Sequence, residues 1–215
     1  MRAYLLIAFA AVIAMLGAAL YGLTELGRGE PPARMIAASI GPTGLKFSSA
    51  YLRPDSRDGG AKDRLDLAAL YPSFAPPSAS PGASDPARLD QRFETTIFIS
   101  IAAAGGDLDP AERPGRLYAR FLSPNSWSHP GGLVARAFEA GSPFESEELF
   151  YVEPEGREFA ARCPKPDQAR KTPTTCIAQY RKDGLDVEIR FSAQLLSEWQ
   201  GINAGVRGLI ERARR

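Results

Sequence analysis

The two cysteines of the chain, Cys163 and Cys176, stand at the ends of the stretch CPKPDQARKTPTTC. Cys163 shares one face of an expected strand with Phe159, and Cys176 shares one face of the next expected strand with Tyr180. If these strands are antiparallel neighbours, the cysteines oppose each other at the mouth of the intervening loop. Their Cα atoms then lie within the roughly 4.4–6.8 Å that a disulfide needs. We therefore predict a structural Cys163–Cys176 disulfide, which contributes about 3 kcal/mol by restricting the unfolded chain.

Other chemistry for this cysteine pair is less favoured. A zinc site needs three or four ligands, and His129 is the only histidine of the chain. A redox pair typically has the spacing Cys-x-x-Cys. Two independent buried thiols remain the alternative to the disulfide. Because stable disulfides form in oxidising compartments, the predicted bond favours a domain outside the cytoplasm.

His129 lies in the stretch NSWSHPGG, beside Ser126 and Ser128, where it could act as the base for a serine nucleophile. Residues so close in sequence seldom adopt the geometry of a catalytic triad, and the sequence has no Gly-x-Ser-x-Gly elbow. A hydrolase is therefore the least favoured function, and we interpret His129 as a solvated loop residue.

Two carboxylate pairs could serve general acid–base chemistry, namely Asp107 with Asp109 and Glu147 with Glu148. We interpret them instead as a helix-start acid and an exposed strand entry. The sequence contains no phosphate-binding loop, dinucleotide fingerprint or calcium loop. We expect no catalytic residue, no metal site and no cofactor.

Aromatic residues in SWSHPGGLVARAF are the candidate binding residues of the sequence. Trp127 and Phe138, with His129 between them, stand in a loop-rich stretch, and tryptophan on a loop is a common binding anchor. The alternative interpretation is a loop that these aromatic side chains hold against the sheet of the same domain.

The first thirty residues are expected to anchor the chain in a lipid bilayer. Residues 4–23 contain no charge and are long enough to cross a hydrocarbon core of about 30 Å as a helix. A cleaved signal peptide is the alternative, with cleavage after Ala19. The balance of Lys and Arg on the two sides of the span gives no clear orientation. The predicted disulfide resolves it, and we expect a single-pass inner-membrane protein whose domain, residues 31–215, lies in the periplasm.

The middle of the chain predicts strands, a flexible loop and one helix. A hairpin is expected over residues 34–53 around GPTG, and residues 72–90, rich in Pro, Ser and Ala, predict a flexible loop. The pattern of residues 92–102 predicts a central strand covered on both faces. A helix capped by Asp109 is expected over 109–122, with the firm helix confined to 114–122 as the alternative because Pro114 and Gly115 weaken the first turn. Irregular structure is expected over 123–147, with a short helix through LVARAFEA.

The C-terminal third predicts two hairpins and a helix. The hairpins are ELFYVEPEGREFAARC and TTCIAQYRKDGLDVEIRF, and complete alternation in LDVEIRF is typical of a strand with one wet face. Ser192 is expected to cap a final helix with one apolar stripe. In that helix Gly201, Gly205 and Gly208 indicate a close backbone contact with the domain itself or with a partner helix. The predicted fold is α+β, a mainly antiparallel sheet of hairpins with the C-terminal helix packed on it, preceded by one transmembrane helix.

Composition excludes one class of partner and leaves binding as the favoured function. With 26 Lys+Arg against 25 Asp+Glu the chain lacks the basic excess of nucleic-acid-binding proteins. An anchor followed by a well-patterned domain without a catalytic constellation predicts a non-enzymatic binding or scaffolding module of the bacterial cell envelope, with an envelope protein as partner. The alternative is a periplasmic domain that binds a small molecule, a lipid or a glycan.

Overall fold

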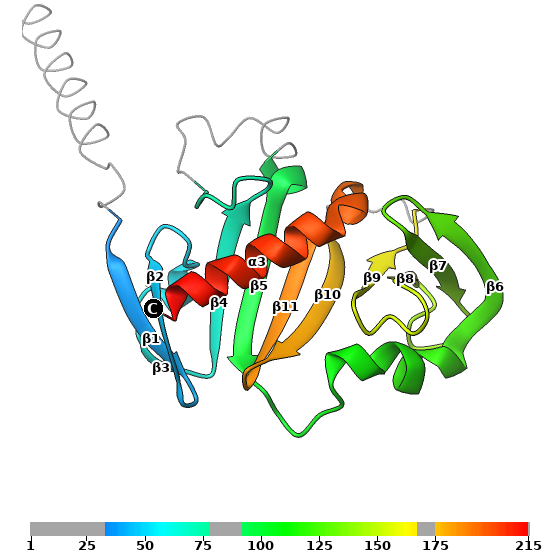
Figure 1. Ribbon diagram of the computed structural model, residues 1–215, viewed down its shortest axis with the longest axis horizontal. Helices are drawn as coiled ribbons and strands as arrows, with labels where there is room; N and C mark the ends of the chain where they lie inside the picture. Colours follow the sequence, from blue (N-terminus) through cyan, green and yellow to red (C-terminus); the bar gives the residue numbers. More distant parts are fainter. Residues whose placement is uncertain (1–32, 78–91, 167–174, 215) are drawn as a thin grey trace, which may run out of the picture. The chain divides into compact units, whose positions relative to one another are not determined.

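Alternation of apolar and polar residues produces two sheets, which Figure 1 shows in a computed structural model. The structure describes residues 33–77, 92–166 and 175–214. The predicted anchor, residues 4–23, and residues 78–90 of the predicted flexible loop lie outside these ranges. Among the helices within them, none has the length and apolar character to cross a bilayer. Residues Arg34–Arg215 form one compact unit.

The larger sheet has eight strands in the order β4-β5-β11-β10-β9-β8-β7-β6, and every neighbouring pair is antiparallel. In that order the strands are β4 (Arg64–Leu70), β5 (Thr96–Ala103), β11 (Leu185–Ser192), β10 (Thr175–Lys182), β9 (Ala160–Pro164), β8 (Glu147–Tyr151), β7 (Leu133–Phe138) and β6 (Leu122–His129). The fold class predicted from the sequence, α+β with a large antiparallel sheet and a C-terminal helix, is confirmed.

The smaller sheet has three strands in the order β2-β1-β3. They are β2 (Thr43–Ser48), β1 (Met35–Ile40) and β3 (Gly60–Lys62), with β1 and β3 parallel. Gly41 and Pro42 connect β1 to β2, and Gly41 has a φ of +52°, as the first position of a type II′ turn requires. This is the hairpin predicted over residues 34–53.

One face of the large sheet is covered by the C-terminal helix α3 (Trp199–Ala213), which follows the 3₁₀ segment η5 (Ala193–Glu198). Ser192 caps this region as predicted, since its hydroxyl accepts a hydrogen bond from the Gln194 N–H at 3.4 Å. The apolar stripe of α3 is buried against the sheet: Trp199, Ile202, Val206, Leu209, Ile210 and Ala213. Within the part of the chain that the structure describes, the opposite face of the sheet is covered at one end, where Tyr118, Leu122, Phe138 and Leu149 form a second apolar cluster.

Three local predictions need correction. Strand β5 begins at Thr96, because residues 92–95 are helical, and Phe98 is only half-buried since α3 covers one face of the sheet. Residues 110–121 are helical as expected, with Asp109 as the N-cap, but they form a succession of short helical segments, η2 (Pro110–Glu112), η3 (Pro114–Tyr118) and η4 (Ala119–Phe121), in place of one regular α-helix. Pro114 and Gly115 stand where a continuous helix would need a backbone donor and a good helix former.

The third correction concerns residues 123–147, which form strands β6 and β7 rather than irregular structure with a short helix. The stretch LVARAF alternates in burial, with Leu133 and Ala135 fully inside the core. Pairing with β8 on one side and β6 on the other satisfies its backbone. Tertiary pairing therefore overrides the helical preference of its alanines and arginine.

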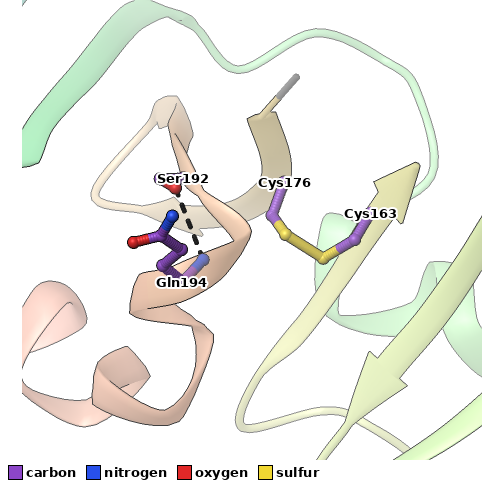
Figure 2. The surroundings of a disulfide bond; sticks show 4 residues. All are labelled: Cys163, Cys176, Ser192 and Gln194. Atoms are coloured by element: carbon purple, nitrogen blue, oxygen red, sulfur yellow. Dashed lines mark hydrogen bonds between the residues drawn. A yellow bond between two sulfur atoms is a disulfide. The ribbon is translucent and has the colours of Figure 1, made fainter. Parts of the chain in front are cut away.

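Both C-terminal hairpins are confirmed. Strands β8 and β9 pair across the turn that contains Gly156, and β10 and β11 pair across Asp183 and Gly184, whose φ values of 51° and 75° fit a type I′ turn. Within the large sheet the ladder between β9 and β10 is the shortest, with two paired positions, whereas β10 and β11 share eight. The Cys163–Cys176 disulfide lies directly beside this short ladder (Figure 2).

Candidate functional site

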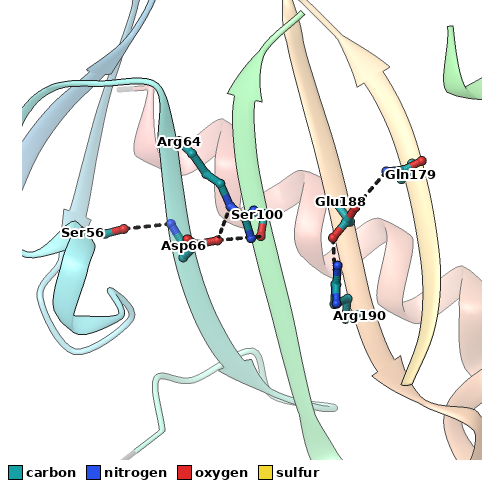
Figure 3. Close-up of polar contacts among 7 residues, drawn as sticks. All are labelled: Ser56, Arg64, Asp66, Ser100, Gln179, Glu188 and Arg190. Atoms are coloured by element: carbon teal, nitrogen blue, oxygen red, sulfur yellow. Dashed lines mark hydrogen bonds and ion pairs between the residues drawn. The ribbon is translucent and has the colours of Figure 1, made fainter. Parts of the chain in front are cut away.

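No helix or strand of the described residues covers one surface of the large sheet, which we call the open face: the side chains of β4, β5, β11 and β10 that point away from α3. Strand register sets these side chains in rows. Asp66 pairs with Ser100, Ser100 with Glu188, and Glu188 with Gln179, so one polar row crosses four strands (Figure 3). Residues far apart in the sequence thereby form one continuous surface.

Hydrogen bonds fix the β4–β5 end of this row. The Ser100 hydroxyl donates to Asp66 Oδ1 at 2.6 Å, and Arg64 Nε reaches the same oxygen at 2.8 Å. Arg64 Nη2 donates to Ser100 Oγ at 2.7 Å, which closes a three-residue cycle. Behind it, the buried Ser56 accepts a hydrogen bond from the Asp66 backbone N–H at 2.9 Å. The Arg64 guanidinium is therefore held on the sheet instead of moving freely in solvent.

The β11–β10 end of the row is fixed in the same way. Glu188 accepts from Gln179 Nε2 at 2.8 Å and from Arg190 Nε at 2.7 Å. Gln179 in turn accepts a hydrogen bond from the guanidinium of Arg113, which stands between η2 and η3. The two ends of the row together hold arginines from three different parts of the chain.

The adjacent row carries a two-pronged ion pair between Arg181 and Asp186. Arg181 Nε and Nη2 reach the two carboxylate oxygens at 2.6 and 2.9 Å. The hydrogen bonds that Arg181 donates to Asp186 raise the pKa of Arg181 above its ordinary value. This pair forms a fixed border of the open face.

A hollow of about 450 Å³ lies on the open face over β4, β5 and β11. Three arginines line it, Arg53, Arg64 and Arg190, together with Phe93 and Phe98. The Arg53 guanidinium lies 5.7 Å from the centre of the Phe98 ring, and Arg190 is the cross-strand neighbour of Phe98. Asp55 and Asp66 also line the hollow, and Glu188 pairs with Arg190, so three carboxylates balance the three guanidinium groups.

The side chains that line the hollow are of the types that bind ligands. Guanidinium groups offer several N–H donors in a plane that matches a carboxylate, and aromatic rings supply apolar contact area. Two hydroxyls line it, those of Ser100 and Thr175; the Ser100 hydroxyl donates to Asp66, and no histidine is among the lining residues. Within residues 33–77, 92–166 and 175–214, no cluster of three His, Cys, Asp or Glu side chains forms a metal site.

The structure separates the residues that a hydrolase would need. Ser126 and Ser128 lie on β6 two positions apart, so they share one face of the strand, and His129 lies on the other. The His129 ring contacts Phe150, with ring centres 5.0 Å apart, and its Nδ1 lies 2.9 Å from the Pro130 carbonyl oxygen. No serine–imidazole pair forms on this strand.

Of the predicted binding residues, the structure brings together two and separates the third. Trp127 and His129 lie on the same face of β6, and the Trp127 side chain is 42% exposed. Phe138 is 2% exposed and packs in the second apolar cluster, where its ring meets those of Tyr118 and Phe144. It points to the opposite face of the sheet from Ala135, the cross-strand partner of Trp127. Phe138 is therefore a core residue.

The predicted disulfide is present. Cys163 and Cys176 are bonded, with Cα atoms 4.1 Å apart, and both side chains are buried. The ladder pairs Ile177 with Arg162, so continuing it by one position sets the two cysteines opposite each other, as their strand faces predicted. The bond closes the mouth of the loop between β9 and β10.

The open face was missed by the sequence analysis, although one of its strands carried a signal. The alternation in LDVEIRF indicates a wet face for Asp186, Glu188 and Arg190. Their partners Ser100 and Gln179 come from strands whose order in the sheet is a tertiary property. No spacing along the chain reveals that order.

Comparison with known proteins shows a fold and no family. The sequence matches no family model and no curated protein. Smlt3025, an immunity protein of the Stenotrophomonas maltophilia type IV secretion system, superposes with a TM-score of 0.59 at 15% identity, covering 84% of this chain and 93% of that one. FrpD, an iron-regulated outer membrane lipoprotein of Neisseria meningitidis, superposes with a TM-score of 0.51 at 13% identity, covering 84% and 92%. At these identities the likeness concerns the fold.

Proposed function

We propose that this chain is a non-enzymatic protein-binding module of the bacterial envelope, and that it receives an acidic segment of a partner protein on its open face. The observation that carries the proposal is the hollow of about 450 Å³ in which Arg53, Arg64 and Arg190 surround two phenylalanines. Arginine and aromatic residues are enriched where binding energy concentrates in protein interfaces.

The arrangement of the arginines favours a ligand with carboxylates. Arg64 and Arg190 are held in place by Asp66 and Glu188, so binding need not order two long side chains from free rotation. Arg53 forms no ion pair with any residue in the described ranges, and its guanidinium lies beside the Phe98 ring. A carboxylate that enters the hollow meets guanidinium donors already held in place by Asp66 and Glu188, together with the guanidinium of Arg53.

The envelope location rests on two features of the chain. Residues 4–23 carry the apolar pattern of a membrane anchor, and the buried Cys163–Cys176 disulfide suits an oxidising compartment. An inner-membrane protein with its domain in the periplasm has both. The shared fold with an immunity protein of a secretion system and with an outer membrane lipoprotein supports a binding role in that compartment, and makes a secreted protein the favoured partner.

The proposal is tested by photocrosslinking in intact cells with the full chain. A photoreactive amino acid replaces Phe98, in the hollow, or Gln200, which is exposed on α3 and serves as the control position. We expect a crosslinked protein from position 98 and none from position 200. The crosslink should disappear in a variant with Arg53→Glu and Arg190→Glu, and should weaken with rising salt.

Two results would contradict the proposal. One is a crosslink at position 98 that persists unchanged in the double charge-reversal variant. The other is a protein that crosslinks equally from Gln200 and from the open face. Topology is measured in the same cells: an impermeant thiol reagent should label Cys163 and Cys176 only after reduction and denaturation of the protein from outside the inner membrane.

A further inference from the structure

The last strand of the large sheet, β6, has an unpaired outer edge. Among the described residues, β6 pairs with β7 and with no other strand. Residues 124–128 are all exposed, on both faces of the strand, and Trp127 protrudes from this segment. The backbone N–H and C=O groups along the outer edge are therefore available to another strand.

The opposite edge of the sheet is treated differently. Strand β4 is covered by the chain that precedes it, where Leu52 bridges to Leu67. The Arg53 N–H donates to the Asp66 carbonyl at 2.9 Å, and the Ala68 N–H donates to the Tyr51 carbonyl at 2.8 Å. The Leu70 N–H donates to the Ala75 carbonyl at 2.9 Å. The outer edge of β4 is thus already paired.

Only the first half of β6 is protected by its own sequence. Pro124 removes one donor, and the register with β7 shifts between Leu122 and Ser126. The second half, residues 125–129, has no proline and no charged residue, although edge strands are commonly guarded by charges. For comparison, the exposed Lys46 lies on β2, one of the two edge strands of the smaller sheet. An uncharged edge is the condition for pairing with an identical strand, since like charges would otherwise meet.

We propose that two copies of this chain associate through residues 125–129 of β6, which pair antiparallel with the same residues of a second copy. The two large sheets then become one continuous sheet, and Trp127 of each copy is covered at the junction. Because the β4 edge is already paired, each large sheet has one edge to offer, and the association closes as a twofold dimer instead of growing into a fibre. This interface lies on β6, at the far edge of the sheet from β4, and is independent of the partner proposed for the open face.

The experiment is sedimentation of the full chain in detergent micelles, with wild type, an edge variant and a control. The edge variant carries Ser126→Lys and Ser128→Lys, which place like charges against each other in the pairing. The control carries Gln200→Lys and Ala204→Lys, two exposed positions on α3. We expect a dimer for wild type and control, and a dissociation constant raised at least about tenfold for the edge variant.

A second experiment tests the proposed dimer with the wild-type protein alone. Amide hydrogen exchange of wild type should show protection of residues 125–129 that rises with protein concentration. A wild type that is monomeric at every concentration overturns the proposal. So does an edge variant that stays dimeric, as it would if the N-terminal segment held the copies together, and so does protection of β6 that appears only when a second protein is added.

Discussion

The ring of Phe74 lies directly on the backbone of Gly205: a Cβ built at Gly205 would stand 2.0 Å from Phe74 Cε2. One helical turn earlier, a Cβ at Gly201 would stand 3.0 Å from the Tyr71 hydroxyl. Phe74 has a φ of +53°, and its carbonyl oxygen accepts a hydrogen bond from the Tyr51 hydroxyl at 3.0 Å. Gly201 and Gly205 of α3 therefore leave the space into which Tyr71 and Phe74, just after β4, pack.

Gly205→Ala should destabilise the protein by about 1–3 kcal/mol, because the new methyl group must displace a buried ring that is fixed by its backbone. Gly208→Ala is the matched control. A Cβ there meets only the far end of the Arg212 side chain, at 3.3 Å, so the better helix propensity of alanine should leave stability equal or raise it by up to about 1 kcal/mol. Urea unfolding of both variants measures the difference, and equal effects would contradict this account.

Removing the disulfide should lower the free energy of unfolding by about 3 kcal/mol, since the bond restricts the unfolded chain across a separation of 13 residues. The test is chemical denaturation of the Cys163→Ala, Cys176→Ala double variant against wild type. Both sulfurs are buried, so a thiol reagent with reductant should label native protein far more slowly than unfolded protein. Rapid labelling of the native state would show that the bond is accessible.

Stability should fall in alkaline solution through Tyr180. Burial raises its pKa from 10.0 to about 12, against the opposing effect of Arg207, whose guanidinium lies 4.1 Å from the centre of the ring. The unfolded chain releases this proton near pH 10 and the folded chain does not. The contribution of the protonated Tyr180 to the free energy of unfolding is therefore complete below pH 10 and is lost between pH 10 and about 12.

The measurement for Tyr180 compares wild type with Tyr180→Phe across this range. The variant should show a smaller loss of unfolding free energy between pH 10 and 11.5, because it has no phenol to ionise. Absorbance titration of the native proteins should assign the late-ionising phenol to this position. Parallel stability curves for the two proteins would rule out the effect.

Arg162 should contribute far more to the stability of the folded protein than Arg157 does. Its guanidinium lies 5.0 Å from the Phe144 ring centre and 2.6 Å from Glu147, in a pair whose side chains are each 22% exposed. Arg162→Ala should cost about 1–3 kcal/mol, since it removes ring contacts and leaves a half-buried carboxylate unpaired. The exposed pair of Arg157 and Glu155 is the control, and a double-mutant cycle there should give no measurable coupling.

Local patterns predicted what depends on neighbours in sequence or on one turn. The hairpins around Gly41, Asp183 and Gly156 follow from turn residues, and the pairing of Cys163 with Cys176 follows from which strand face each occupies. The apolar stripe of α3 and the Ser192 cap of the preceding η5 were legible for the same reason.

What depends on sheet order was not legible. The stretch LVARAF forms a strand because β6 and β8 flank it, and the open face exists because β5 lies between β4 and β11. The glycines of α3 indicated a close contact, but the residues that make it, Tyr71 and Phe74, stand at the start of a Pro-rich stretch that composition alone assigns to a flexible loop. Tertiary partners decide such segments.

The ladder between β9 and β10 has two paired positions, and it joins the half of the sheet under α3 to the half that carries the second apolar cluster. Under a shearing force, this short β9–β10 ladder would separate before any other strand pair of the sheet. The disulfide beside the ladder bears the force covalently and holds the two halves of the sheet together. The resistance of this sheet to a pulling force therefore depends on whether Cys163 and Cys176 have been oxidised.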